Sequence, residues 1–139
     1  MNHNKINQSF LGAYIKLDKA CSDKLDAKYG ITEYINKLTD AKTAFGRGEV
    51  LPKLIKYRKI RNKLAHEPDA MQKLEEASRE DVKWLEKFER KLSCGRDPLT
   101  KYLKRAGSKD RQRALIRTLI LIGAAAVVIL AIIIIFKAF

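Results

Sequence analysis

The end of the chain carries the feature that most constrains its fold. Residues 119–136 read LILIGAAAVVILAIIIIF, eighteen residues without a charged or strongly polar side chain. As a helix they rise about 27 Å, which is close to the hydrocarbon thickness of a bilayer. A core helix in a chain this short keeps a polar face, and this segment has none. The sequence therefore predicts a transmembrane helix over 119–136.

The distribution of basic residues predicts the orientation of that helix. Residues 96–118 form a basic juxtamembrane linker, in which eight Lys and Arg face two Asp, whereas one lysine follows the apolar segment. Basic residues are retained on the cytoplasmic side, so we expect a single-pass, tail-anchored membrane protein with a cytoplasmic N-terminal domain. The start of the chain, MNHNKINQSF, has no apolar run typical of a secretory signal. A topology signal explains the linker more simply than binding of its cations to anionic lipid head groups.

Residues 1–95 are predicted to form a small antiparallel four-helix bundle, so the fold class is all-α. Apolar residues recur at spacings of three and four, and no stretch alternates as a strand does. We expect Pro52 in the first turn of the third helix, and a hinge at Gly107-Ser108. The four helices are expected over 5–28, 31–43, 50–66 and 79–93, followed by a short helical piece over 98–105.

The two cysteines give no indication of a metal site. Cys21 lies on the apolar face of the first helix and Cys94 lies at the end of the fourth, without the paired spacing of metal ligands. We therefore expect neither a metal nor a cofactor.

The third predicted helix places an arginine where an apolar side chain is expected. At 100° per residue, Arg61 falls in the middle of an arc of Val, Leu, Ile and Tyr side chains. A guanidinium there must pair with a carboxylate, reach solvent or line a cleft that receives an anion. An internal ion pair with Asp18, Glu33 or Glu89 is the structural alternative to an anion site.

The neighbours of Arg61 favour an anion site. Asn62 and His66 are four residues apart, so the amide can orient the imidazole, a group able to accept and donate a proton near neutral pH. Residues 47–63 hold seven cations and one acid, which suggests a polyanionic partner such as RNA, although a solvated helix face is the commoner explanation. The candidate RNA-binding residues are Lys53, Lys56, Arg58, Lys59 and Lys63.

The string YRKIRNKLAHEP, with RNKLAH spanning Arg61 to His66, resembles the Arg-x4–6-His motif of HEPN domains. The resemblance covers roughly residues 5–93. It implies a four-helix bundle that acts as a metal-independent endoribonuclease, with the site formed where two motifs meet in a homodimer. Arg61, Asn62 and His66 would then be catalytic and would leave a 2′,3′-cyclic phosphate. The alternatives are a non-catalytic adaptor or dimerisation module, and a protein that acts only in the bilayer.

Overall fold

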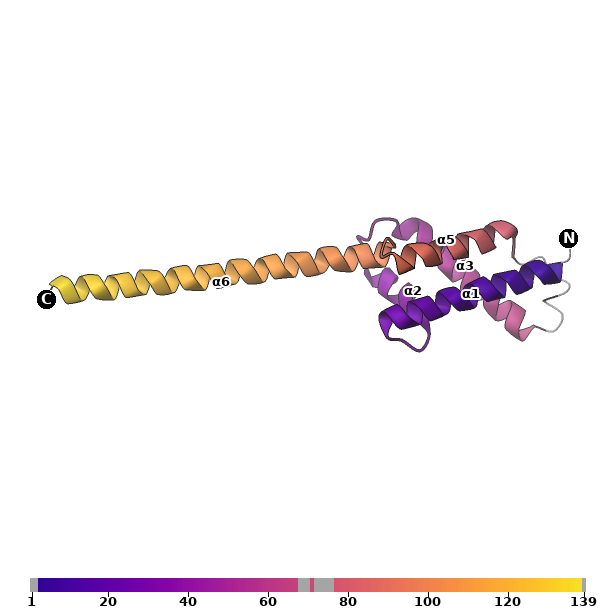
Figure 1. Cartoon of the computed structure of the whole chain (residues 1–139), viewed down its shortest axis with the longest axis horizontal. Helices are drawn as coiled ribbons and strands as arrows, with labels where there is room; N and C mark the ends of the chain where they lie inside the picture. Colours follow the sequence, from indigo (N-terminus) through magenta and orange to yellow (C-terminus); the bar gives the residue numbers. More distant parts are fainter. Residues whose placement is uncertain (1–2, 68–70, 72–76, 139) are drawn as a thin grey trace. The chain divides into compact units, whose positions relative to one another are not determined.

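The computed structural model describes residues 3–67, 71 and 77–138, and within these ranges it contains helices and no strand. The chain divides into two compact units, Met1–Tyr102 and Leu103–Phe139. The predicted all-α fold, a helical bundle followed by a long apolar helix, is confirmed (Figure 1). The helices are α1 (His3–Leu25), α2 (Gly30–Asp40), α3 (Arg47–His66), α5 (Arg79–Ser93) and α6 (Pro98–Ala138).

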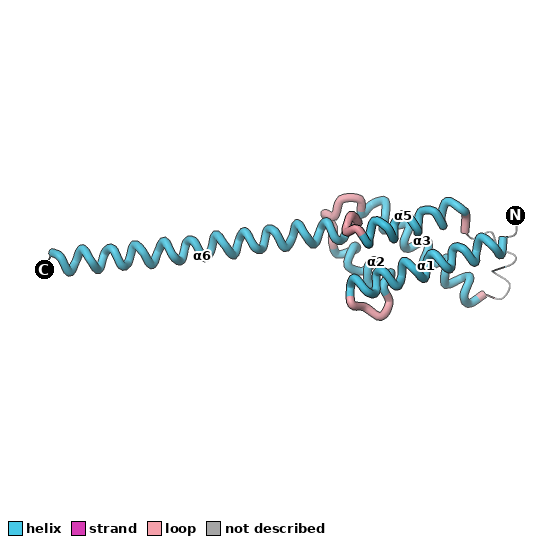
Figure 2. Tube along the Cα trace, viewed as in Figure 1, coloured by secondary structure: helices cyan, strands magenta, loops and turns pink. Residues whose placement is uncertain are grey.

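In the first unit, α1 packs against α2, α3 and α5, and α2 also packs against α3. The helices α1 and α5 run in the same direction, and α3 runs antiparallel to α5 (Figure 1). Loops connect α1 to α2 and α2 to α3 (Figure 2). Burial of the apolar faces supplies the main stabilising force of such a bundle. The largest fully buried apolar side chains are Tyr34, Phe10, Leu17, Ile31, Leu38, Leu54, Leu85, Leu92 and Leu99.

The helix boundaries follow local capping chemistry. The expected fourth helix, 79–93, has those bounds in the structure, because Ser78 and Asp81 form a reciprocal capping box. The third helix begins three residues earlier than expected, which places Pro52 inside it rather than in its first turn. Its early start follows from Gly46, which takes a left-handed conformation with φ of 82°, and from Arg47, whose Nε donates to the carbonyl oxygen of Leu38 over 2.9 Å.

The expected short helix, hinge and transmembrane helix form one continuous helix, α6. The prediction of a hinge at Gly107-Ser108 is therefore wrong, because both residues are helical. Pro98 suits the first helical position, and the residues that follow are rich in Lys, Arg, Leu and Ala, which favour helix. A single glycine among them costs only about 1 kcal/mol, so it does not end the helix. Of the described residues, one helix is long and apolar enough to cross a membrane.

The first turn of α6 is fixed to the bundle by a buried carboxylate. Asp97 is fully buried, and its Oδ1 lies 3.2 Å from Nζ of Lys24. Its Oδ2 accepts from the Tyr34 hydroxyl over 2.8 Å and from the Thr100 backbone N–H over 3.0 Å. Burial opposes the charge on Asp97, but the hydrogen bonds from Thr100 and Tyr34 and the charge of Lys24 outweigh it and lower its pKa. The same carboxylate raises the pKa of Tyr34, which burial already raises.

We expect the bundle to lose stability below about pH 4. The pKa values of Asp81 and Asp97 are lowered in the folded chain from an ordinary value of 3.8, so both carboxylates stabilise the fold above that pH. As the pH falls through the folded pKa values, the unfolded chain takes up protons first and this stabilisation is lost. Urea unfolding followed by fluorescence of Trp84, the single tryptophan, would measure it at pH 3 and pH 6. A loss that is equally large in Asp97→Asn would contradict the assignment to Asp97.

Candidate functional site

Arg61 lines a cavity of about 300 Å³ on the surface of the bundle. The cavity combines two guanidinium groups, a side-chain amide, tyrosines and one carboxylate. Arg61 and Arg58 are half-buried there, and Tyr29, in the turn before α2, keeps 64% of its surface exposed. Cations beside an exposed aromatic ring suit a phosphate-bearing ligand. The lining residues are Tyr14, Ile15, Asp18, Tyr29, Thr32, Arg58, Arg61 and Asn62.

Neither arginine of this cavity forms an ion pair with a carboxylate in the described part of the chain. The carboxylates considered as partners of Arg61 bond elsewhere. Asp18 accepts from the backbone N–H of Ile31 over 2.8 Å. Glu33 pairs with Lys37 at 3.3 Å, and Glu89 accepts from Ser93 over 3.1 Å.

Asp18 still influences the cavity, because it faces the same space as Arg61. Burial raises the pKa of Tyr14 to about 12, and the charge of Asp18 adds to this effect while Arg61 and Arg58 oppose it. The Tyr14 hydroxyl is thus protonated at neutral pH and remains a hydrogen-bond donor in the cavity.

Of the three residues predicted to be catalytic, one chain brings two together. Arg61 Nη1 donates to Asn62 Oδ1 over 3.3 Å, so this amide oxygen is directed to the guanidinium rather than to His66. His66 is exposed at the last position of α3 and does not line the cavity. Five helical steps rotate it by about 140° from Arg61. A site that contains both groups would therefore require a second chain.

The predicted RNA-binding residues lie on different faces of α3. Arg58 lines the cavity with Arg61. Lys53 lies over the ring of Trp84 at 5.3 Å, and Lys56 is 3.2 Å from Asp81. Lys56 also lines a mainly apolar depression together with Lys59 and Lys63. Three of the five predicted residues thus share one depression, whereas Arg58 and Lys53 lie at other places on α3.

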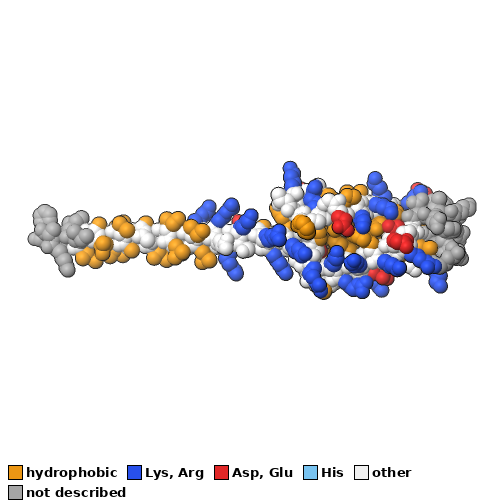
Figure 3. Space-filling model, turned by 90° about the horizontal axis from the view of Figure 1, so that it is seen from above, with side chains coloured by type: hydrophobic (Ala, Val, Ile, Leu, Met, Phe, Trp, Pro, Cys, Tyr) orange, Lys and Arg blue, Asp and Glu red, His pale blue; other side chains and the backbone are white. Residues whose placement is uncertain are grey.

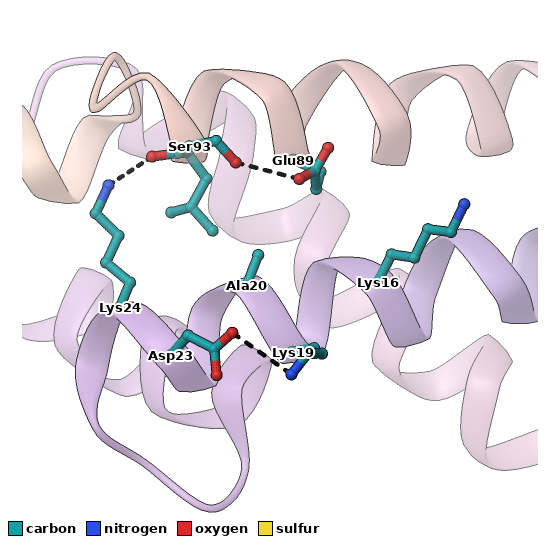
Figure 4. Close-up of a pocket in the computed structure, with 8 residues that line it drawn as sticks. Lys16, Lys19, Ala20, Asp23, Lys24, Glu89 and Ser93 are labelled. Carbon is teal, nitrogen blue, oxygen red and sulfur yellow. Dashed lines mark hydrogen bonds and ion pairs between the residues drawn. The ribbon is translucent and has the colours of Figure 1, made fainter.

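A groove between α1 and α5 gathers lysines that the sequence patterns did not single out (Figure 4). It measures about 670 Å³ and is lined by Lys16, Lys19 and Lys24 of α1 together with Glu89 of α5. Lys19 pairs with Asp23 at 3.7 Å, and Lys24 donates to the carbonyl oxygen of Leu92 over 2.6 Å. These partners satisfy much of the charge in the groove, in contrast to the Arg58–Arg61 cavity. The packing of α1 on α5 creates the groove, so no local motif predicts it.

No candidate metal centre is present in the described ranges, because no cluster of three His, Cys, Asp or Glu residues is found there. Cys21 is buried, as expected, and burial raises its pKa to about 12. Cys94 is exposed.

The fold and the cavity define a small all-α protein with an apolar C-terminal helix and a bundle whose visible face carries many Lys and Arg side chains and few Asp and Glu (Figure 3). The chain belongs to the family of unknown function DUF6548, whose model matches residues 8–118. That match spans the bundle and the basic segment that precedes the apolar residues. No curated protein and no solved structure gives a significant match to the chain.

This family assignment corrects the resemblance to HEPN domains, which is wrong. The model that matches is that of DUF6548, and no HEPN model matches. An arginine followed within a few residues by a histidine is a short pattern. It arises by chance in a helix as rich in basic residues as α3, so it is weak evidence of kinship.

Proposed function

We propose that the protein is a membrane-anchored, non-catalytic adaptor that binds single-stranded RNA at the Arg58–Arg61 cavity. The observation that carries this proposal is that two half-buried guanidinium groups share a cavity with an exposed tyrosine and lack a carboxylate partner in the described residues. Phosphate oxygens would bond to the arginines, and a base would stack on Tyr29. The apolar part of α6 would hold the protein in a membrane, with the bundle in the cytoplasm.

Binding alone is favoured over RNA cleavage because the cavity has no group suited to act as a general base at neutral pH. The Tyr14 hydroxyl, buried by the packing of α1, has a raised pKa, and Asp18 already accepts a hydrogen bond from the backbone of α2. His66 is the remaining candidate, and it lies outside the cavity of its own chain. The endoribonuclease hypothesis therefore depends on a homodimer that brings the His66 of one chain to the Arg61 of another.

We expect Arg61→Ala to weaken RNA binding about tenfold, because a charged hydrogen bond to phosphate contributes about 1.5 kcal/mol or more. The full chain in nanodiscs of zwitterionic lipid would be titrated with labelled single-stranded RNA in the presence of EDTA. Arg90→Ala is the matched control, because Arg90 is exposed on α5 and bonds only to the carbonyl oxygen of Glu86 in the described part of the chain. Equal weakening by the two variants would reject a specific site at Arg61.

His66 separates the two functions in the same assay. For an adaptor, His66→Ala binds RNA as the unmodified chain does, and neither protein shortens the strand. If the unmodified chain cleaves RNA in EDTA and His66→Ala does not, the protein is an endoribonuclease and the adaptor proposal fails. Cleavage by both proteins alike would indicate a contaminating nuclease, which a preparation of Arg61→Ala processed in parallel would reveal.

A further inference from the structure

The loop between α2 and α3 exposes a phenylalanine. Phe45 keeps 82% of its surface in solvent, more than any other large hydrophobic side chain described in the first unit. Its neighbour Ala44 is buried, and so is Ala41. Hydrogen bonds hold the turn, from the Ala44 N–H to the carbonyl oxygen of Ala41 over 3.0 Å and from the Arg47 N–H to that of Ala44 over 3.2 Å. The buried alanines fix the loop in a conformation that leaves Phe45 outside the core.

Cations surround this phenylalanine. Phe45 lines a cavity of about 210 Å³ together with Trp84 and Phe88, whose rings stack with centroids 4.9 Å apart. The one acidic residue of its lining, Glu49, lies 3.9 Å from Lys53. No ion pair neutralises the four cations of the lining in the described residues. These cations are Lys87, Lys91, Arg96 and Lys101, and with Phe45 they are named the Phe45 patch.

We propose that the Phe45 patch binds anionic lipid head groups of the membrane that α6 enters, with the Phe45 ring inserted between them. Aromatic rings flanked by Lys and Arg are typical of protein surfaces that contact the membrane interface. Each cation near an anionic membrane surface contributes to binding, and the patch supplies four. The proposal does not depend on RNA binding, because the patch shares no residue with the Arg58–Arg61 cavity.

The anchor makes weak lipid contacts effective. The patch ends at Lys101, and the apolar segment begins at Leu119. Both residues belong to the continuous helix α6, in which this segment rises about 27 Å. The bundle therefore stays near the bilayer surface, where the effective concentration of head groups is high. An acidic protein or an RNA strand would have to reach the same patch from solution.

Trp84 provides a direct test, because it lines the patch cavity and is the single tryptophan of the chain. The full chain would be placed in nanodiscs containing brominated lipids, which quench tryptophan only at close range. We expect the fluorescence of Trp84 to be quenched when brominated phosphatidylglycerol is mixed with phosphatidylcholine. We expect no quenching when the membrane consists of brominated phosphatidylcholine alone. Equal quenching in both membranes would overturn the proposal, as would its absence from both.

Matched variants assign the effect to the patch. We expect the triple variant Lys87→Gln, Lys91→Gln and Arg96→Gln to abolish the dependence on anionic lipid. The control variant Lys5→Gln, Lys16→Gln and Lys28→Gln removes the same charge from exposed positions outside the patch and should retain it. We expect Phe45→Ser to reduce quenching at least twofold, unlike Ile15→Ser, which alters another exposed apolar side chain. If the two triple variants behave alike, or if RNA displaces the lipid from an unmodified patch, the patch is not a lipid site.

Discussion

Replacing Asp97 by alanine should destabilise the bundle by about 3–5 kcal/mol, because each buried donor left without its acceptor costs about 1–3 kcal/mol. Asp97 is fully buried and accepts from Tyr34 and from the N–H of Thr100, and it lies 3.2 Å from Lys24. Its loss would leave the Tyr34 hydroxyl and the Thr100 N–H without this acceptor, whereas Lys24 would keep the carbonyl oxygen of Leu92. Urea unfolding monitored by Trp84 fluorescence in detergent micelles would measure the change in the bundle.

Asp23→Ala is the matched control for this prediction. Asp23 also pairs with a lysine, Lys19, at 3.7 Å, but both side chains are largely exposed. Exposed ion pairs contribute little, so we expect a change of about 0.5 kcal/mol or less. A similar small change in Asp97→Ala would show that the buried carboxylate does not hold the first turn of α6.

The local role of Asp97 could be predicted from the sequence, but its long-range contacts could not. The Asp97-Pro98 pair predicts a helix start, because aspartate caps helices and proline suits the first position. What the local pattern does not contain is the pairing with Lys24 and Tyr34, which lie 73 and 63 residues away in the chain. Only the packing of α1, α2 and α5 brings these groups together, so Asp97 was predicted to belong to a linker outside the bundle.

The helices α1, α2, α3 and α5 were predictable, since each buries a stripe of apolar residues at helical spacing. The anomaly of Arg61 was also visible, because a charged residue interrupts the stripe of α3. The environment of Arg61 could not be predicted, because Asp18 was an equally reasonable ion-pair partner. In the structure the carboxylate of Asp18 accepts a hydrogen bond from the N–H of Ile31 instead. The position of His66 could not be predicted either. Its spacing from Arg61 is compatible with a site shared by two chains, but His66 does not line the Arg58–Arg61 cavity of its own chain.

Gly30→Ala should be the second strongly destabilising substitution, costing about 3 kcal/mol, in the upper range for overpacking a core. Gly30 begins α2 where it crosses α1, and a Cβ at this position would overlap with the backbone oxygen of Asp18 and the backbone nitrogen of Ser22. Rotation of a side chain cannot relieve an overlap with backbone atoms, so the two helices must move apart. That movement would also lengthen the hydrogen bond between Asp18 and Ile31, now 2.8 Å.

Gly12→Ala tests the same chemistry with the opposite expected sign. Gly12 is also helical, but nothing lies within 4 Å of a Cβ built at this position. Alanine favours helix over glycine, so we expect a gain of about 0.5–1 kcal/mol. Thermal unfolding followed by Trp84 fluorescence would show a midpoint lowered by roughly 15 °C in Gly30→Ala and raised by a few degrees in Gly12→Ala. If both variants become more stable, α2 does not approach α1 as closely as the structure shows. Thr32 of α2 would then not line the Arg58–Arg61 cavity as it does here.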